Sequence, residues 1–353
     1  MINCKKFRQK DIENFVFLSK KQYSNEETTN SKHILWKHCL SPLGKSEYIT
    51  LKHKNKIIGR SLLQPQHFKI GMKTYKIALV TDVLIDPNYR FPPTNFIKLT
   101  KACEKNGSYD FIYHTSNNIT ENFYRKLFNF NQPIKMKSYG FPIKLSNFIK
   151  NKIGFKLEIL DLIFYFFKKL NLLILDVINL ITDIDIIRKV PSDQELKSLI
   201  NQAIIMKTPI FIKNQRFLKW RFETSSLWRS KIFSVVKDNK NLGYFCSRIV
   251  RIDGIYYFTV LDFFYSEKLT KLELFKIRLI QYKMACELAA DAIFTMTNPN
   301  SNIGKNTIGY PFLRIPDSLL PHKTPIFFRS LPISISLPTI SKTHITLADL
   351  DYF

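Results

Sequence analysis

The stretch ALVTDVLIDPNYR, residues 78–90, decides the fold. Apart from Thr81 and Asp82 it is apolar up to residue 85, as expected of a central strand that is covered on both faces, and Pro87 ends it. A carboxylate in such a strand is costly unless it is paired or functional. Burial would raise the pKa of Asp82, which suits a general base, so we predict a catalytic role for this residue.

The Asp82 strand belongs to an internal repeat. FTVLDFFYS at residues 258–266 shows the same pattern around Asp262. Further landmarks keep their order at offsets of 181 or 184 residues, namely Trp36 and Trp220, Gly59 and Gly243, Asp110 and Asp291, and Asn117 and Asn298. Self-similarity at one spacing indicates a duplicated unit. A chain of 353 residues is long enough for two domains of about 150 residues.

Periodicity predicts the same mixture of elements in both copies. In the first copy we expect helices at 10–22, 31–40, 95–105 and 120–128, and strands at 47–53, 56–70, 75–86, 110–116 and 134–144. In the second we expect helices at 192–204 and 269–288, and strands at 231–237, 242–250, 255–265 and 291–297. Mixed strands flanked by helices predict an α/β (α+β) fold. The predicted division is a domain at 1–150, an amphipathic helical connector at 151–190 and a domain at 191–353.

The segment 155–187 is apolar except for a narrow stripe of polar residues that lie mostly three or four apart. One interpretation is a core or inter-domain helix. The alternatives are a dimer contact or peripheral contact with an anionic membrane surface, because a basic chain is attracted to an anionic leaflet.

The composition limits the partners. Lys and Arg total 54 against 28 Asp and Glu, a net charge of +26 that attracts polyanions. The codon bias of an AT-rich genome is the alternative cause. No block of five or six basic residues occurs, and aromatic residues lie in apolar strands, so nucleic-acid readout is not predicted.

The cysteines and the N-terminus indicate location. Five scattered cysteines without a CxxC pair suit a reducing cytoplasm, and neither they nor the scattered histidines suggest a metal site. No signal peptide and no spanning segment is recognised. We therefore expect a cytoplasmic protein, free or peripheral on the inner face of the membrane.

The sequence from Ala78 to Phe130 resembles the GNAT acetyltransferase family. VLIDPNYR is followed by a predicted helix, a strand that ends at Asn117 and the motif ENFYRKLFNF. The residues that match the family pattern are Pro87, Tyr89, Arg90, Tyr124, Lys126 and Phe130. The repeat makes the layout similar to tandem GNAT-like proteins of surface-polysaccharide gene clusters, and to Fem-type aminoacyltransferases.

The resemblance implies two tandem GNAT-like mixed-sheet domains and an acyltransferase activity. The acyl group would move from acetyl-CoA or another acyl-CoA to an amine or hydroxyl acceptor, such as a sugar or cell-surface polysaccharide precursor. Tyr124 would return a proton to the departing thiolate, with Asp82 as the base. The implied donor-binding residues are Leu84, Ile85, Arg90, Thr94, Asn95 and Asn117.

One motif departs from the family pattern. Where the family has R-x-x-G-x-G/A, this chain has Arg90-Phe91-Pro92-Pro93-Thr94-Asn95, so both small residues are replaced and two amide donors are missing. This departure leaves two alternatives. One is a Fem-type transferase that takes its aminoacyl group from tRNA, and the other is a non-catalytic scaffold with a degenerate GNAT fold.

Overall fold

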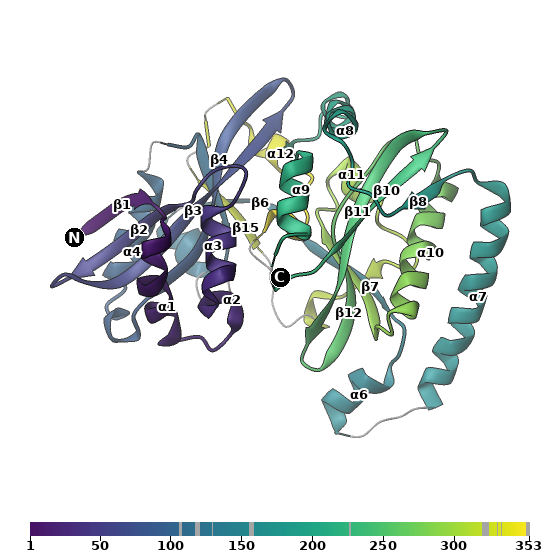
Figure 1. The fold of residues 1–353 in the computed structure, drawn as a ribbon, viewed down its shortest axis with the longest axis horizontal. Coiled ribbons are helices and arrows are strands. Elements are labelled where there is room, and N and C mark those ends of the chain that lie inside the picture. Colours follow the sequence, from purple (N-terminus) through teal and green to yellow (C-terminus); the bar gives the residue numbers. More distant parts are fainter. Residues whose placement is uncertain are drawn as a thin grey trace. The chain divides into compact units, whose positions relative to one another are not determined.

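The structure is a computed structural model that describes residues 1–105, 108–116, 121–128, 130–154, 159–225, 227–319, 325–329, 331–332 and 334–350. The chain forms two compact units, each with its own mixed β-sheet and flanking helices (Figure 1). Unit 1 comprises Met1–Ile134, Pro209–Arg229 and Thr324–Ile340. Unit 2 comprises Lys135–Thr208, Ser230–Lys323 and Ser341–Phe353. The predicted fold class is therefore confirmed.

The sheet of unit 1 has the order β1-β2-β3-β4-β5-β15-β6, with β9 paired to β3. Its strands are β1 (Ile2–Lys6), β2 (Glu47–His53), β3 (Lys56–Ile70), β4 (Lys73–Ile85), β5 (Phe111–Thr115), β6 (Asn131–Lys135), β9 (Ile210–Phe211) and β15 (Pro325–Arg329). Its helices are η1 (Gln9–Asp11), α1 (Ile12–Lys20), α2 (Glu26–Thr29), α3 (Ser31–Cys39), η2 (Pro87–Tyr89), α4 (Thr94–Glu104), α9 (Gln215–Phe222), α12 (Leu337–Ile340) and a π-helical turn, η3 (Phe123–Leu127).

Helices cover both faces of this sheet. Neighbouring side chains of a strand point to opposite faces. Leu62 of β3 therefore packs with Phe15 of α1 and Ile34 of α3, whereas the adjacent Leu63 shares a cluster with Leu99 of α4. Burial on both faces explains why β4 is an almost continuous apolar run.

The sheet of unit 2 has the order β14-β7-β13-β12-β11-β10-β8. Its strands are β7 (Lys137–Pro142), β8 (Asp185–Ile187), β10 (Lys231–Lys237), β11 (Lys240–Ile252), β12 (Ile255–Tyr265), β13 (Ala292–Thr297) and β14 (Leu313–Arg314). Its helices are α6 (Ser146–Ile153), α7 (Ile159–Ile181), α8 (Asp193–Ile205), α10 (Lys271–Glu287), α11 (Asn302–Lys305), η4 (Asp317–Leu319) and η5 (Leu347–Asp349).

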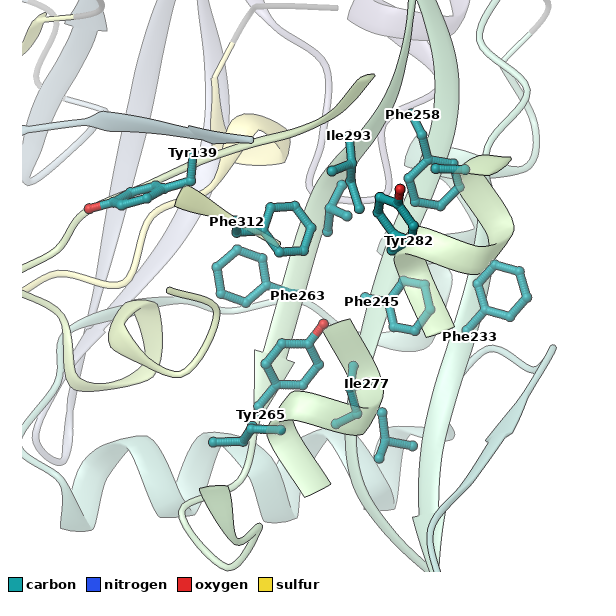
Figure 2. Packing of buried hydrophobic residues seen from close by; sticks show 14 of the residues in the cluster. Tyr139, Phe233, Phe245, Phe258, Phe263, Tyr265, Ile277, Tyr282, Ile293 and Phe312 are labelled. Atoms are coloured by element: carbon teal, nitrogen blue, oxygen red, sulfur yellow. The ribbon is translucent and has the colours of Figure 1, made fainter. Parts of the chain in front are cut away.

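Aromatic side chains dominate the core of unit 2. Phe245 and Phe263 of the sheet pack with Ile277 and Tyr282 of α10 (Figure 2). On the other side of α10, its residue Leu279 contacts Leu175 and Ile178 of α7. The long apolar helix predicted within 155–187 is thus the outer layer of unit 2, and its described part runs from Ile159 to Ile181.

The repeat extends to local geometry. Lys54 and Asn55 both have positive φ in the β2–β3 turn, and Asp238 and Asn239 match them 184 residues later in the β10–β11 turn. Two consecutive positive φ angles define the tight hairpin turn that suits twisted strands. A Cβ on Gly243 would lie 2.4 Å from the carbonyl oxygen of Phe264, so this landmark glycine permits a close approach of β11 and β12.

The two units are interleaved along the chain, which differs from the continuous division predicted from the sequence. The last strand of the first repeat, β7, pairs with β13 in unit 2, and β15 of the second repeat pairs with β5 in unit 1. Helix α9 of the second repeat also lies in unit 1. There the indole N–H of Trp36 donates to the carbonyl of Trp220 (3.0 Å), and that of Trp220 donates to the carbonyl of Trp36 (3.2 Å).

Candidate functional site

Strands β4 and β5 part at the middle of the unit 1 sheet. Their parallel pairing joins only Ile77–Leu79 to Phe111–Tyr113, although β4 continues to Ile85. The register of β4 against β3 also shifts between Arg60 and Leu62, and Asp82 at this bulge has a φ of 51°. A bulge bends the strand that carries it. Beyond Leu79, the edge of β4 that faces β5 therefore has no strand partner among the described residues, and we call this place the unit 1 opening.

Aromatic side chains fill the unit 1 opening. Tyr124 is 5% exposed, and its ring lies 3.8 Å from the His114 ring between centroids. Phe130 and Phe327 pack on the same pair. The space that they leave against Val80 and the other lining residues has room for about one water molecule. Among the described residues, this cavity is too small for the arm of a coenzyme.

Burial sets the protonation of this cluster. It raises the pKa of the Tyr124 phenol well above its ordinary value, outweighing a hydrogen bond with Thr100. Burial also lowers the pKa of His114 to about 3, against a weaker opposing effect of the Thr115 carbonyl. At neutral pH the phenol thus keeps its proton and the imidazole is uncharged. A proton donor must be protonated, so the environment suits the role predicted for Tyr124.

Asp82 lies in a different, charged environment. Its Oδ2 accepts from Lys37 Nζ at 2.8 Å and from Thr81 Oγ1 at 2.9 Å, and lies 3.2 Å from His38 Nε2. Nδ1 of the same imidazole is 3.0 Å from Ser46 Oγ. Helix α3 positions Lys37 and His38, and the Asn30 side chain caps the start of that helix.

The expected rise in the pKa of Asp82 is wrong. Burial pushes the pKa upward, but Lys37, His38 and Arg60 together outweigh it and hold the pKa well below its ordinary value. Such a carboxylate stays ionised and accepts protons poorly. The described hydrogen bonds, ion pairs and ring contacts of Asp82 do not include Tyr124, so the structure does not join the two predicted catalytic residues.

The predicted donor-binding residues are mostly engaged elsewhere. Leu84 and Ile85 pair with β3, and the guanidinium of Arg90 donates to the carbonyl of Ile85 and to the side chain of Gln22. Asn95 Nδ2 donates to the Tyr89 carbonyl at 2.9 Å.

Thr94 and Asn117 are the other two predicted donor-binding residues. Thr94 is the first residue of α4, and Pro93 before it gives the helix no side-chain cap. Asn117 lies outside the described residues. In this part of unit 1, the group best suited to bind a phosphate is therefore the backbone at the start of α4.

Strands β12 and β13 of unit 2 part in the same way, since their pairing stops at Val260 and Thr295 while β12 runs on to Tyr265. Here the chain's own segment 341–350 occupies the gap, which we call the unit 2 opening. Asn298 Nδ2 donates to the carbonyls of Ser341 and Thr343, both at 2.8 Å. His344 Nε2 lies 2.8 Å from the Phe263 carbonyl. The segment is thus tied to β12 and to Asn298, the residue that directly follows β13.

Asp262, the counterpart of Asp82, is bound by hydroxyl groups and by the backbone N–H of Phe263. Thr346 Oγ1 donates to its Oδ1 at 2.8 Å, and the hydroxyl of Tyr244 donates to its Oδ2 at 3.1 Å. The acidic residue that recurs in the repeat therefore fastens the segment 341–350 in unit 2, whereas in unit 1 it binds a lysine.

Three solved structures share this arrangement of strands. A conserved protein of unknown function from Enterococcus faecalis, a probable N-acyltransferase, matches with a TM-score of 0.57 at 11% identity over 94% of this chain and 73% of that one. A GCN5-related N-acetyltransferase from Anabaena variabilis matches with a TM-score of 0.57 at 11% identity over 94% and 74%. The N-myristoyltransferase of Saccharomyces cerevisiae, solved with bound myristoyl-CoA, matches with a TM-score of 0.53 at 10% identity over 93% and 78%.

The chain has a GNAT fold. Because each match covers more than nine-tenths of the chain, the GNAT likeness extends over both repeats. No protein-family model and no curated protein matches the amino-acid sequence. The similarity to polysaccharide-cluster proteins and to Fem-type transferases stays a prediction.

Lys37, His38 and Arg60 were not recognised from the sequence. Arg60 is 1% exposed, donates to Ser19 Oγ at 2.7 Å and stacks on the Phe15 ring. The only sequence feature that could have indicated these three residues is their position next to landmarks of the repeat. Lys37 and His38 directly follow Trp36, and Arg60 directly follows Gly59.

The described residues contain no cluster of three or more His, Cys, Asp or Glu side chains suited to a metal ion. Within the same part of the chain, none of the helices combines the length and the apolar character needed to span a bilayer.

Proposed function

We propose that this GNAT-fold chain is an acyltransferase whose acyl-CoA donor binds at the unit 1 opening. The observation that carries the proposal is the difference between the two openings. In unit 1 the strands part beside a protonated, buried tyrosine on a π-helical turn, and π-helical turns are frequent at functional sites. In unit 2 a hydrogen-bonded segment of the chain already holds the equivalent place.

The backbone of unit 1 suits an acyl-CoA, but the side chains in the unit 1 opening do not. The backbone suits it, because β4 has an unpaired edge beyond Leu79 and α4 begins just after that strand, with amides suited to a phosphate. The side chains leave no room, so η3 with Tyr124 must move before a donor can enter. An acyl-CoA supplies an activated thioester and a thiolate leaving group.

The residues of unit 1 then have distinct roles in the proposal. Tyr124 holds the proton that a departing thiolate takes up, and the acceptor releases its own proton to solvent as the new amide or ester bond forms. Asp82 is a positioning residue that keeps Lys37 and His38 in place through its ion pair. The acceptor is an amine or hydroxyl, with a sugar or polysaccharide precursor as the first class to examine. That acceptor class rests on the sequence resemblance.

The test is turnover of acetyl-CoA with a panel of amino sugars, measured as release of free thiol. We expect Tyr124→Phe to lower kcat by about 10²- to 10⁴-fold, the usual contribution of a positioned proton donor. The matched control is Tyr265→Phe in unit 2, which also removes a buried phenol with a hydrogen bond, here to Gln281. Equal turnover in wild type and Tyr124→Phe would remove the assigned role.

A non-catalytic GNAT-fold scaffold is the second candidate, and the filled unit 1 opening favours it. Calorimetry with acetyl-CoA separates the two, since a scaffold with a closed opening gives no binding heat. The tRNA-dependent alternative predicts tRNA binding that weakens steeply with salt. It stays a prediction.

A further inference from the structure

Helix α7 has one face packed on unit 2 and one face uncovered. Asn171, Leu175 and Ile178 are each 3–4% exposed, and Asn171 Nδ2 donates to the hydroxyl of Tyr310. Nine apolar side chains of α7 are each 51–86% exposed. Leu162 and Ile181 lie on the flanks of the uncovered face, and the other seven are Ile159, Ile163, Phe166, Leu170, Leu173, Val177 and Leu180. We call these seven the α7 seam.

The α7 seam has the spacing of a coiled coil. Its successive members are separated by four, three, four, three, four and three residues. This alternation is the heptad pattern in which two helices interlock along a seam. A helix of 23 residues is about 35 Å long, and an apolar patch of that length is at the upper end of what monomers leave in water. The spacing therefore indicates another helix as the occupant.

Two charged residues on one flank of the seam identify which helix fits. Lys169 and Asp176 are both exposed, lie seven residues apart at the same heptad position, and have no ion-pair partner among the described residues. In an antiparallel pair, flanks of the same heptad position face each other. When Leu170 faces Leu173 of the second copy, Lys169 comes to the level of Asp176 of that copy, and the reverse holds at the other end.

The same register also suits the other flank, where Phe167 comes opposite Ile174 of the second copy. A parallel pair would instead place Lys169 beside Ile174 and Asp176 beside Ile181, so its charges would have no partners. The α7 seam is therefore complementary to itself only in the antiparallel direction.

The charge around α7 argues against a membrane as the occupant. Helix α7 contains two lysines and two aspartates and so has no net charge, in a chain whose total is +26. Helices that lie on anionic membranes carry Lys and Arg on their flanks. We infer that the α7 seam is a dimer interface, in which α7 of two copies of this chain pack antiparallel with reciprocal Lys169–Asp176 ion pairs.

The test is a charge exchange followed by sedimentation equilibrium of the full chain over a range of concentrations. Lys169→Asp or Asp176→Lys alone turns two attractive pairs into two repulsive ones, and we expect either to raise the dimer Kd about tenfold or more. The double variant K169D/D176K restores both pairs and should return the Kd to within about threefold of wild type. Such rescue does not occur if the charges merely affect folding.

An apolar variant provides the second arm. Leu173→Asp, in the middle of the seam, should leave the protein monomeric. Ile205→Asp, which changes a side chain that is 72% exposed at the end of α8, is the matched control and should leave the dimer intact. A chain that is monomeric at all concentrations overturns the inference. Flotation of that monomer with phosphatidylcholine–phosphatidylserine vesicles, lost in Leu173→Asp, would assign the seam to a membrane instead.

Discussion

The unit 1 and unit 2 openings begin in the same way and are closed differently. In both units a parallel pair of strands loses its hydrogen bonds after a few residues, near an acidic residue that recurs in the repeat. In unit 1 the gap is closed by side chains of a short π-helical turn and its neighbours. In unit 2 it is closed by the backbone of segment 341–350, tied to β12 and to Asn298 directly after β13.

This difference shows how one duplicated fold can separate two roles. Moving a few aromatic side chains requires a change in one turn, whereas clearing the unit 2 opening requires the removal of a whole buried segment. We therefore expect unit 1 to open more readily than unit 2. The following predictions test that contrast.

The largest expected effect is that of truncating the chain after Lys342. This change removes three nearly fully buried side chains of the segment, Ile345, Leu347 and Leu350. At about 1.5–3 kcal/mol for each, the loss is roughly 5–9 kcal/mol, comparable to the whole stability of a domain. We expect hydrogen exchange to show β12 and β13 unprotected while β3 and β4 stay protected. Unchanged protection of β12 would contradict a structural role for the segment.

The second prediction compares the two recurring aspartates. Asp82→Asn leaves Lys37 buried without its carboxylate, and breaking a buried ion pair costs about 3–5 kcal/mol. Asp262→Asn is the matched change in unit 2. There the described hydrogen-bond partners are two hydroxyl groups and the backbone N–H of Phe263, so we expect a smaller cost of about 1–3 kcal/mol. Denaturant unfolding of both variants measures the difference, and equal costs would mean that the two environments are alike.

The third prediction concerns acid. Folded His114 has a pKa of about 3, whereas an exposed histidine in the unfolded chain binds its proton near pH 6.5. Its contribution to the unfolding free energy is thus complete above pH 6.5 and is lost as the pH falls toward 3, at about 1.4 kcal/mol per pH unit. Between pH 6.5 and 4.5 this amounts to about 3 kcal/mol.

His114→Phe removes that titration and should flatten the decline in stability over this window by about the same amount. His33, whose pKa burial also lowers to about 3, remains in the variant and accounts for part of the residual slope. The measurement is denaturant unfolding at a series of pH values. An unchanged slope in His114→Phe would show that this imidazole is not buried in its neutral form.

Most individual elements could be predicted because their causes are local. The ranges 47–53, 56–70, 231–237 and 255–265 match β2, β3, β10 and β12 residue for residue. Turn residues with positive φ and a glycine at a close approach occupy fixed places in the sequence, so the repeat could also be recognised.

The pKa of Asp82, the filling of the openings and the division into units could not be predicted in this way. Lys37 lies 45 residues from Asp82, and its effect on the pKa depends on where α3 packs. The pattern of apolar residues in a strand shows that the strand is buried. It does not show which strand will be its neighbour, because the backbone hydrogen-bonding groups at its edges can pair with many other strands. The sequence by itself determined the elements and their duplication. Tertiary structure alone decided that β7 pairs in the sheet of unit 2, that β15 pairs in the sheet of unit 1, and that Lys37 lowers the pKa of Asp82. The physical reason is that strand pairing and electrostatic interaction depend on distance in space and not on distance along the chain.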